Sequence, residues 1–407
     1  MRIALLPDDY LPASTLNHAK MFHELAHELM KQGHDVVVIT PGLPKQKKAL
    51  FTEYVDGVLV WRFRAGVRRG EGVSKLQRAI NESLLSFLAW RAIKREVNKS
   101  PFDLCVNYSP TIFFGFLAAK LRRKYNTTVY LVLRDMFPQW AIDAGMIKNK
   151  SLITKYFRYV ELVNYQSAHK IGVMSVANLA YFSALNPQYK NVEVLHNWAS
   201  LLPSTFDNYS LNIRKEYSLE GKVIFFYGGN IGHAQDMANL MRLASSLKQY
   251  PRAHVLIVGQ GDEFALVSTL KKELALKNIT LLPSVNQDEY KQLLTQVDVG
   301  LFTLAKTHKA HNFPGKLLGY MVQSLPILGS VNQGNDLVDY VNDSGAGFAY
   351  VNGEDEALLN GAIKLLESEA LRHTMGEHSS QLLKQHFSVE NAAQIILQAV
   401  GTSCTTS

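Results

Sequence analysis

Short apolar runs alternate with amphipathic segments along most of the chain, beginning at its first residues. Residues 3–6 are all apolar, and residues 18–32 then carry apolar side chains every three or four positions, up to Gly33. Residues 34–42 form a second apolar run that ends in a turn. Unbroken apolar runs are typical of buried parallel strands, and three- and four-residue spacing is typical of an amphipathic helix. The N-terminus therefore predicts a strand–helix–strand unit.

The same alternation continues to residue 198. It predicts strands and helices in turn, with a basic helix after the second region of strands. The predicted strands are residues 51–63, 104–106, 128–133, 171–175 and 192–197, and the helices that follow the basic one are residues 111–125 and 151–166. This order of elements is typical of a parallel α/β sheet.

Residues 199–222 lose the periodicity, are rich in Ser, Pro and Asn, and predict a linker. The strand and helix pattern then restarts. We therefore predict two doubly wound, Rossmann-like α/β domains, residues 1–198 and 199–385, whose ligand loops face a central cleft. A C-terminal helix and tail, residues 386–407, are free to cross back to the N-terminal domain.

The segment around Lys316 carries the most specific chemistry. An apolar strand is predicted up to Leu304, and a helix is predicted from Pro314, with Asn312 as its N-cap. The free amides and positive dipole end of a helix start attract anions, and Lys316 in the first turn adds a charge. These features favour a phosphate, although a surface lysine on an ordinary crossover helix fits the same pattern.

A second candidate anion site is the glycine turn at residues 228–232, GGNIG, which follows an apolar strand. Glycines after a strand let backbone amides approach a phosphate closely. Alone, such a glycine turn is more often a simple tight turn, because the full dinucleotide motif is absent. Together with Lys316 it favours a nucleotide diphosphate.

Length and composition bound the class of protein. The chain has 407 residues, of which 47% are hydrophobic, which suits two domains. It contains no apolar run of membrane-spanning length, and MRIALLPDDY does not resemble a signal peptide, so we expect a cytoplasmic protein. Cys105 lies in an apolar strand and Cys404 in a polar tail, which predicts neither a disulfide nor a cysteine metal site.

The net charge is +8, and much of it is concentrated between Arg62 and Lys99, which contain ten basic and three acidic residues. Apolar side chains from Leu76 to Trp90 give this segment an amphipathic pattern. Such a segment suits an anionic membrane surface, but a helix packed on the core with a solvated basic rim fits equally well. No nucleic-acid partner is predicted, because no binding motif accompanies the charge.

Several of these segments resemble segments of a known protein family. They are DDYLPASTLNHAKMFHELAHELMKQGHDVVVIT, VEVLHNW, YGGNIGHAQD, HVLIVGQGDE, VDVGLFTL and FPGKLLGYMVQSLPILGS. Together they resemble the family-four glycosyltransferases, which have the two-lobed GT-B fold. The resemblance covers almost the whole chain and is most specific in residues 227–236 and 314–326. Within that family the chain looks most similar to the bacterial N-acetyl-L-fucosaminyl transferases of O-antigen and capsule synthesis.

This resemblance implies roles for particular residues. Lys316 and the amides after it match the helix start that binds the diphosphate, the glycine turn matches the phosphate loop, and Asp135 lies near a catalytic position of the N-terminal domain. A loop at Pro283 to Val285 matches the one that holds the base. The implied donor-binding residues are Ser14, Thr15, Gly229, Asn230, Gly232, Pro283, Val285, His311, Lys316, Leu317 and Leu318.

The chain departs from the family pattern at three places. Many members carry two glutamates eight residues apart, where this chain has His311 and Gly319. The lysine that often follows the glycine loop is replaced by His233 or Ala234. Contacts to the donor sugar and the ribose therefore stay open, and His311 fits either a sugar contact or a solvated loop position.

The implied mechanism is a metal-independent transfer from a UDP-sugar that retains anomeric configuration, with no cofactor. Lys316 would neutralise the charge on the departing diphosphate. No Asp-x-Asp motif is present. Asp135 is the candidate group that orients or deprotonates the acceptor hydroxyl, although a loop cap or a pair with Arg134 fits it as well. His18 and His196 are interpreted as structural residues.

The implied partners are a nucleotide-sugar donor and a polyprenyl-diphosphate-linked sugar acceptor. Because such an acceptor stays in the bilayer, we expect peripheral contact with the inner face of the cytoplasmic membrane through the segment from Arg62 to Lys99. Two other functions fit the same scaffold: a nucleotide-sugar epimerase or hydrolase, and a catalytically degenerate nucleotide-binding subunit.

Overall fold

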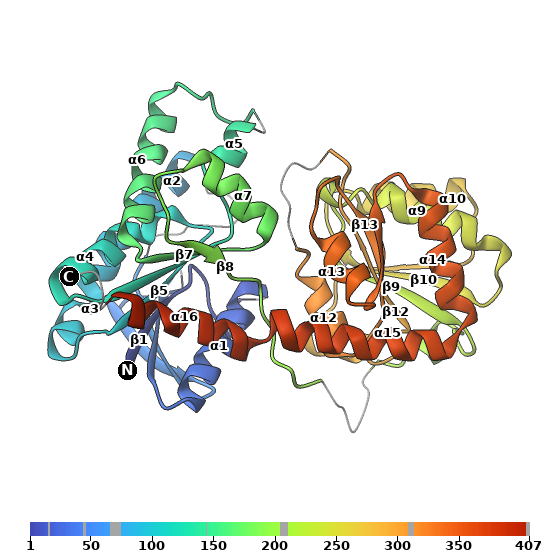
Figure 1. Ribbon diagram of the computed structural model, residues 1–407, viewed down its shortest axis with the longest axis horizontal. Coiled ribbons are helices and arrows are strands. Elements are labelled where there is room, and N and C mark those ends of the chain that lie inside the picture. The colour runs from blue at the N-terminus through green and yellow to red at the C-terminus, as the bar shows by residue number, and fades with distance from the viewer. Residues whose placement is uncertain are drawn as a thin grey trace. The chain divides into compact units, whose positions relative to one another are not determined.

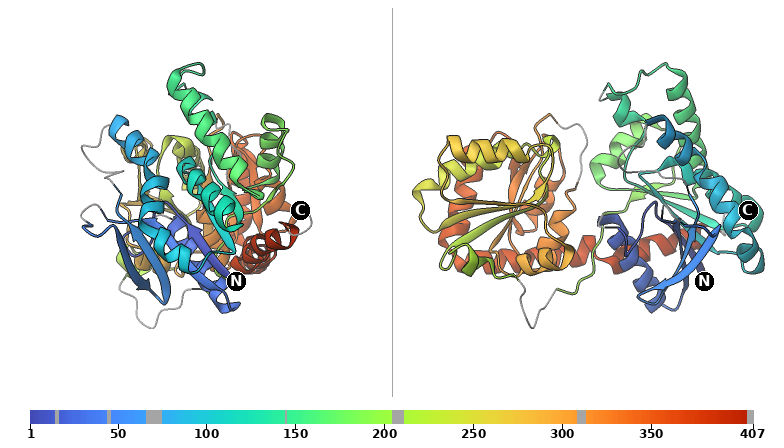
Figure 2. Two further views of the ribbon diagram at one scale, coloured as in Figure 1. Left: turned by 90° about the vertical axis from the view of Figure 1, so that its left-hand side faces the viewer. Right: turned by 180° about the vertical axis from the view of Figure 1, so that it is seen from behind.

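The computed structural model describes residues 1–14, 17–43, 46–65, 75–143, 145–203, 211–307 and 313–403. The chain forms two compact units. Unit 1 comprises Met1–Met174, Leu179–His196 and Val389–Ser407, and unit 2 comprises Ser175–Asn178 and Asn197–Ser388. Each unit has a central sheet with helices on both faces (Figures 1 and 2), which is the doubly wound α/β architecture.

The sheet of unit 1 has the strand order β3-β4-β2-β1-β5-β6-β7-β8. Its strands are β1 Arg2–Leu6, β2 Asp35–Pro41, β3 Leu50–Val55, β4 Val58–Phe63, β5 Leu104–Ser109, β6 Thr128–Leu133, β7 Lys170–Val173 and β8 Val192–Val194. All neighbours pair in parallel except β3 and β4, which are antiparallel. Asp56 and Gly57, with φ of 47° and 83°, form the two-residue turn between them, because such hairpins require positive φ at both positions.

Eight α-helices of unit 1 lie within the described residues. They are α1 Asn17–Lys31, α2 Lys75–Ser83, α3 Leu85–Lys99, α4 Gly115–Tyr125, α5 Gln139–Asp143, α6 Leu152–Ser167, α7 Val176–Leu185, which begins in unit 2, and α16 Val389–Ser403. The predicted basic helix is two helices, α2 and α3. The sequence pattern did not predict α7, because only Phe182 of this helix is buried and its apolar residues mark no clear face.

The sheet of unit 2 has the strand order β11-β10-β9-β12-β13-β14 and is parallel throughout. Its strands are β9 Val223–Asn230, β10 Ala253–Gln260, β11 Ile279–Leu282, β12 Val299–Thr303, β13 Ile327–Val331 and β14 Gly347–Val351. Its helices are α8 Ile213–Glu216, α9 Met237–Ser246, α10 Phe264–Glu273, α11 Gln287–Leu294, α12 Lys316–Val322, α13 Leu337–Asp343, α14 Asp355–Glu367 and α15 Glu369–Leu382. The sequence pattern predicted neither α13 nor β14.

The predicted start of helix α12 is wrong by two residues. The helix begins at Lys316 with Gly315 as its N-cap, and not at Pro314. The Leu317 amide donates to the Pro314 carbonyl at 3.0 Å, so a tight turn precedes the helix. Asn312, the predicted N-cap, lies outside the described residues.

The C-terminal helix α16 belongs to unit 1, although unit 2 precedes it in the chain. It packs against α1 and β6 (Figure 1). Its side chains Ala393 and Ile396 are fully buried. The described helices include none with both the length and the apolar character needed to cross a bilayer.

Candidate functional site

Lys316 lies at the carboxyl end of strand β9 with its ammonium group enclosed by protein. Its Nζ is 3.3 Å from the centroid of the Tyr227 ring. A Cβ added at Gly229 would lie 3.7 Å from Cε and 3.9 Å from Nζ of this lysine. Residues 227 and 229 share one face of the strand because side chains alternate. The lysine therefore lies over a strip of β9 formed by an aromatic ring and a glycine.

The position of Lys316 is fixed by Tyr320, one turn further along α12. The fully buried Tyr320 hydroxyl accepts a hydrogen bond from the Gly228 amide at 3.2 Å and donates to the Leu301 carbonyl at 3.1 Å. These bonds tie α12 to both β9 and β12. Gly300 makes room for the ring, since a Cβ there would come within 2.3 Å of it. The helix start is thus held against the ends of two neighbouring strands.

Lys316 Nζ is a buried cation without a hydrogen-bond partner in the described structure. Burial lowers the pKa of this amine well below its ordinary value. A buried charge normally requires a partner of opposite sign. An anion placed at the end of β9 would supply one, and it would raise the pKa of the amine again.

Residues 228–230 of the predicted glycine turn are the end of strand β9, so the turn itself begins at Ile231, and neighbouring residues hold this segment. Asn230 is exposed and donates from Nδ2 to Gln235 Oε1 at 2.7 Å, and a Cβ at Gly232 would lie 2.6 Å from that same nitrogen. The amide of Ile231 donates to the Gln260 carbonyl at 2.9 Å. His233, also exposed, donates from its amide to Asp262 at 3.3 Å. The segment from Asn230 to His233 is therefore held in place by hydrogen bonds, and Gly229, which precedes it, is the residue that lies next to Lys316.

Strands β9 and β10 stay paired up to Asn230 and Gln260, which brings a third loop close to the glycine turn. Gln260 Oε1 accepts a hydrogen bond from the Ser284 hydroxyl at 3.0 Å. Ser284 lies between Pro283 and Val285, the predicted base-binding loop, which follows β11. The structure therefore connects this loop to the end of β10, in the same unit as Lys316.

The residues after Lys316 differ in what they offer a ligand. Leu317 and Leu318 are buried side chains, and the Leu317 amide is already bonded to Pro314. A Cβ at Gly319 would lie 3.2 Å from Leu294 of α11, so this position packs against a helix. Among these positions, Lys316 is the one whose polar group is both buried and unpaired within the described residues.

In unit 1, Asp135 follows strand β6 and is accessible to solvent. The pKa of its carboxyl is raised, first by the protein atoms that crowd it and then by the negative charge of Asp8, while Arg134 and His18 act in the opposite direction. Asp8 is buried, with 1% of its surface exposed, and its Oδ1 is 3.2 Å from His18 Nε2. The ends of β1 and β6 flank β5, so these residues share one edge of the sheet.

The Arg134 side chain forms hydrogen bonds to main-chain atoms. Its guanidinium donates to the carbonyl oxygens of Gly172 and His196, and burial lowers its pKa to about 10. His196 donates from Nδ1 to the Met174 carbonyl at 2.9 Å. Both side chains thus form hydrogen bonds to main-chain carbonyl groups.

The structure describes some of the other predicted residues. Ser14 is buried in the loop after β1. Thr15 and His311 lie outside the described residues. His233, one of the two residues that replace the expected lysine, has Nδ1 3.3 Å from Glu263 Oε1, and Glu263 also accepts from the Met237 amide at the start of α9.

The sequence interpretation missed Tyr227 and Asp8, and it assigned His18 to structure alone. A signal for each was present. Tyr227 immediately precedes the two glycines, and Asp8 directly follows the first strand, where ligand loops of such sheets lie. No set of three metal-binding side chains (His, Cys, Asp or Glu) comes together among the residues that the structure describes.

Known family models match both halves of the chain. Residues 185–382 match the family described as glycosyl transferases group 1, and residues 18–198 match the glycosyl transferase 4-like domain. A curated relative, the probable glycosyltransferase WbjE of Pseudomonas aeruginosa, is 23% identical over 267 residues. That alignment covers 63% of this chain and 64% of WbjE, so this chain matches less than two thirds of the length of that relative.

Solved structures with the same fold cover the whole chain. Sucrose-phosphate synthase of Thermosynechococcus elongatus superposes with a TM-score of 0.70 at 15% identity, over 100% of both chains. HepE of Anabaena, solved in complex with UDP and glucose, has a TM-score of 0.67 at 14% identity and covers 99% of this chain and 100% of its own. The solved structures and the paired Rossmann-like units show the GT-B fold, and on that fold the C-terminal half of the chain matches the group 1 glycosyl transferases and the N-terminal half matches the glycosyl transferase 4-like domain.

Proposed function

We propose that this glycosyltransferase transfers a sugar from a nucleotide diphosphate sugar to an acceptor hydroxyl, and that Lys316 binds the diphosphate. The observation that carries the proposal is the buried Lys316 Nζ, which has no hydrogen-bond partner among the described residues and lies beside Gly229 at the end of β9. A glycine there leaves space next to the ammonium for a ligand oxygen. A diphosphate would supply negative charge as a partner for the ammonium group of Lys316.

The leaving diphosphate gains negative charge as the bond to the sugar breaks. A preorganised lysine at a helix start stabilises that charge most strongly where water is excluded, and the Lys316 amine is fully enclosed. This arrangement supports a transfer that does not require a metal ion. Retention of anomeric configuration is proposed from the family resemblance alone.

Asp135 is proposed to orient or deprotonate the acceptor hydroxyl. A carboxylate with a raised pKa is a stronger base than an ordinary aspartate, and Asp8 contributes to that increase. His18, which pairs with Asp8, would limit the repulsion between the two carboxylates. The three residues come from the loops after β1 and β6 and the start of α1.

The finer assignment concerns the donor and the acceptor. We propose UDP as the nucleotide, in line with the UDP complex of HepE, and an aminosugar such as N-acetyl-L-fucosamine as the transferred group. The proposed acceptor is a polyprenyl-diphosphate-linked sugar in O-antigen or capsule synthesis at the inner face of the cytoplasmic membrane. The exposed cations Arg78, Arg91 and Lys94 of α2 and α3 support contact with that surface.

A calorimetric titration with UDP tests the proposal directly. Wild-type protein should bind UDP, and Lys316→Met should bind at least about a hundredfold more weakly, because a charge-assisted contact to a buried diphosphate is lost. Lys272→Met, which removes an exposed lysine of the same unit, is the matched control. Equal UDP affinity of Lys316→Met and wild type would overturn the assignment of this site.

Donor consumption with and without acceptor separates the remaining functions. A transferase consumes UDP-sugar only when an acceptor is present. A hydrolase or epimerase would consume it in both cases, and a degenerate subunit would bind UDP but consume no donor.

A further inference from the structure

Large apolar side chains are exposed along one side of unit 1, on helices that otherwise pack well. Tyr159 is 57% exposed and Phe116 is 39% exposed, and their rings lie 6.2 Å apart, joining α6 to α4. The Tyr156 hydroxyl donates to the Ser83 hydroxyl at 2.7 Å, joining α6 to the end of α2. Phe87 of α3 is 60% exposed. The first two contacts join exposed residues of α2, α4 and α6.

This surface continues at the start of α6, which projects beyond the sheet together with α5 (Figures 1 and 2). Leu152 is 84% exposed there, and Ile153 is 46% exposed. A side chain as large as leucine is rarely left so open in a continuous apolar band unless something covers it. The band therefore predicts an apolar partner.

Cations border the band on α4. Lys120, Arg123 and Lys124 are exposed, and none of these three has an ion-pair partner in the described part of the chain. Lys120 Nζ lies 4.7 Å from the Trp90 ring centroid. Helix α4 contains no acidic residue, and the only acid of α6, Glu161, is buried and paired with Arg158 at 2.9 Å. Among the described residues, no carboxylate of α4 or α6 pairs with these three cations.

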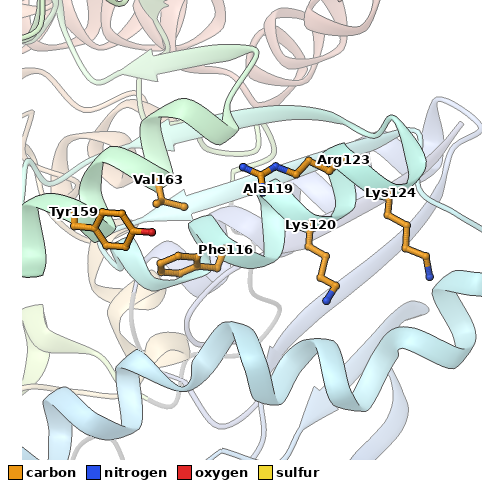
Figure 3. A pocket seen from close by; sticks show the side chains of 7 residues that line it. All are labelled: Phe116, Ala119, Lys120, Arg123, Lys124, Tyr159 and Val163. Carbon is orange, nitrogen blue, oxygen red and sulfur yellow. The ribbon is translucent and has the colours of Figure 1, made fainter.

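A hollow of about 500 Å³ lies between the apolar and the basic parts of this surface. Figure 3 shows its wall: Tyr159 and Val163 come from α6, and Phe116, Lys120 and Lys124 come from α4, with the two lysines extending from the same side of their helix. An anionic group in the hollow would meet ammonium groups at one end and aromatic rings at the other.

We propose that the hollow binds the phosphate of an anionic phospholipid, and that the exposed band of α4 and α6 enters the interface of the bilayer. Aromatic and aliphatic side chains next to lysines and an arginine are the combination that such interfaces favour. This inference rests on the proposed membrane contact, but it assigns the contact to α4 and α6, outside the basic segment from Arg62 to Lys99.

Vesicle co-sedimentation tests the assignment. The key variant replaces Lys120, Arg123 and Lys124 with Gln, and should lower partitioning onto phosphatidylglycerol vesicles about a hundredfold, at roughly fivefold for each cation. Two variants with the same loss of charge serve as controls. One replaces Lys215, Lys272 and Lys277 of unit 2 with Gln, and the other replaces Arg91, Lys94 and Arg95 of α3.

Tyr159→Ser provides an independent arm for the apolar part. It should weaken binding to the same vesicles about tenfold, because an aromatic side chain that enters the bilayer interface is removed. The strength of binding to vesicles made only of phosphatidylcholine should be low for every variant. Circular dichroism of each variant checks that the fold is kept.

The outcomes are distinct. Loss of binding by the α4 variant, with the unit 2 variant like wild type, supports the proposal. If the α4 variant binds like wild type while the α3 variant is released, the headgroup site is overturned and the basic segment carries the contact. If the wild-type protein does not bind phosphatidylglycerol vesicles, or binds nucleic acid or protein in preference, the proposal of a membrane-binding surface is overturned. UDP titration of the same samples reports the donor site separately, so its failure is not confused with these results.

Discussion

Lys316 illustrates how a side chain suited to binding a ligand can lower the stability of the folded protein. Lys316 is enclosed without a counter-charge from the residues that the structure describes, and burial lowers its pKa. The unfolded chain, in which this lysine has an ordinary pKa, therefore binds more protons than the folded protein does at a pH between the two pKa values. Stability consequently rises with pH between the lowered pKa and about 10, where the unfolded lysine also loses its proton.

We expect Lys316→Met to stabilise unit 2 at pH 7. Methionine fills similar space without a charge to desolvate, and the gain should be on the order of 1 to 3 kcal/mol. Urea unfolding at pH 7 and at pH 10 checks this, because the advantage of the variant should shrink as the pH rises. A variant less stable than wild type at pH 7 would mean that the lysine is already compensated.

UDP binding should be accompanied by proton uptake. A diphosphate beside Lys316 raises the pKa that burial has lowered, so affinity should fall as the pH rises from the lowered pKa toward the pKa of the complex. Calorimetry at pH 8 in two buffers with different enthalpies of ionisation measures the protons taken up. Lys316→Met should show none, and an equal uptake in both proteins would place the titrating group elsewhere.

Asp135 gives a prediction on rate. Asp135→Asn should reduce turnover with acceptor about a hundredfold or more, with UDP affinity unchanged, because a general base contributes roughly 100- to 10,000-fold. Asp8→Asn should leave more activity but move the acidic limb of the pH–rate profile to lower pH, since the negative charge of Asp8 raises the pKa of Asp135. An unshifted profile would show that the two carboxylates are not coupled.

At the scale of elements, one tyrosine joins a helix to two strands. Tyr320→Phe keeps the ring that fits over Gly300 but removes the hydroxyl that bonds to Gly228 and Leu301. The buried amide and carbonyl lose their partner, so unit 2 should be destabilised by about 1 to 3 kcal/mol. Thermal unfolding with and without UDP measures this. Tyr217→Phe, which changes a tyrosine outside this contact, is the control, and equal melting temperatures of the two variants would contradict the role of the hydroxyl.

The pattern of apolar residues predicted most elements because each strand and helix buries a continuous face. The predicted helix at residues 151–166 is α6 within one residue at each end, with Ser151 as its N-cap. The apolar pattern did not predict α7, where few side chains are buried, and it did not predict α13 and β14, which are short. The antiparallel turn of Asp56 and Gly57 has a local signal that the sequence interpretation did not use.

The candidate site was predictable only in part, for a physical reason. The lysine and the glycines could be recognised from their spacing, but the contact of Lys316 with Tyr227 depends on how α12 lies over β9. The proximity of Asp8, His18 and Asp135 depends on strand order, which joins loops more than one hundred residues apart in the chain. Periodicity contains no information about either.

At the scale of the whole molecule, unit 1 depends on a helix from the far end of the chain. Removal of the residues after Ser388 deletes α16 and exposes the surfaces of α1 and β6 that it covers. We expect hydrogen exchange to increase in α1 and β6, while β9 and β10 keep their protection and UDP still binds. Unchanged exchange in β6 would contradict a supporting role for α16.

The late position of α16 also has a consequence for synthesis. The ribosome makes the strands of unit 1 first, then all of unit 2, and only afterwards Val389–Ser403. The sheet of unit 1 therefore lacks part of its apolar covering while roughly half of the protein is still being translated. During that interval nascent chains would be vulnerable to aggregation, and a chaperone that shields this face would matter more than for a protein whose domains are completed one after the other.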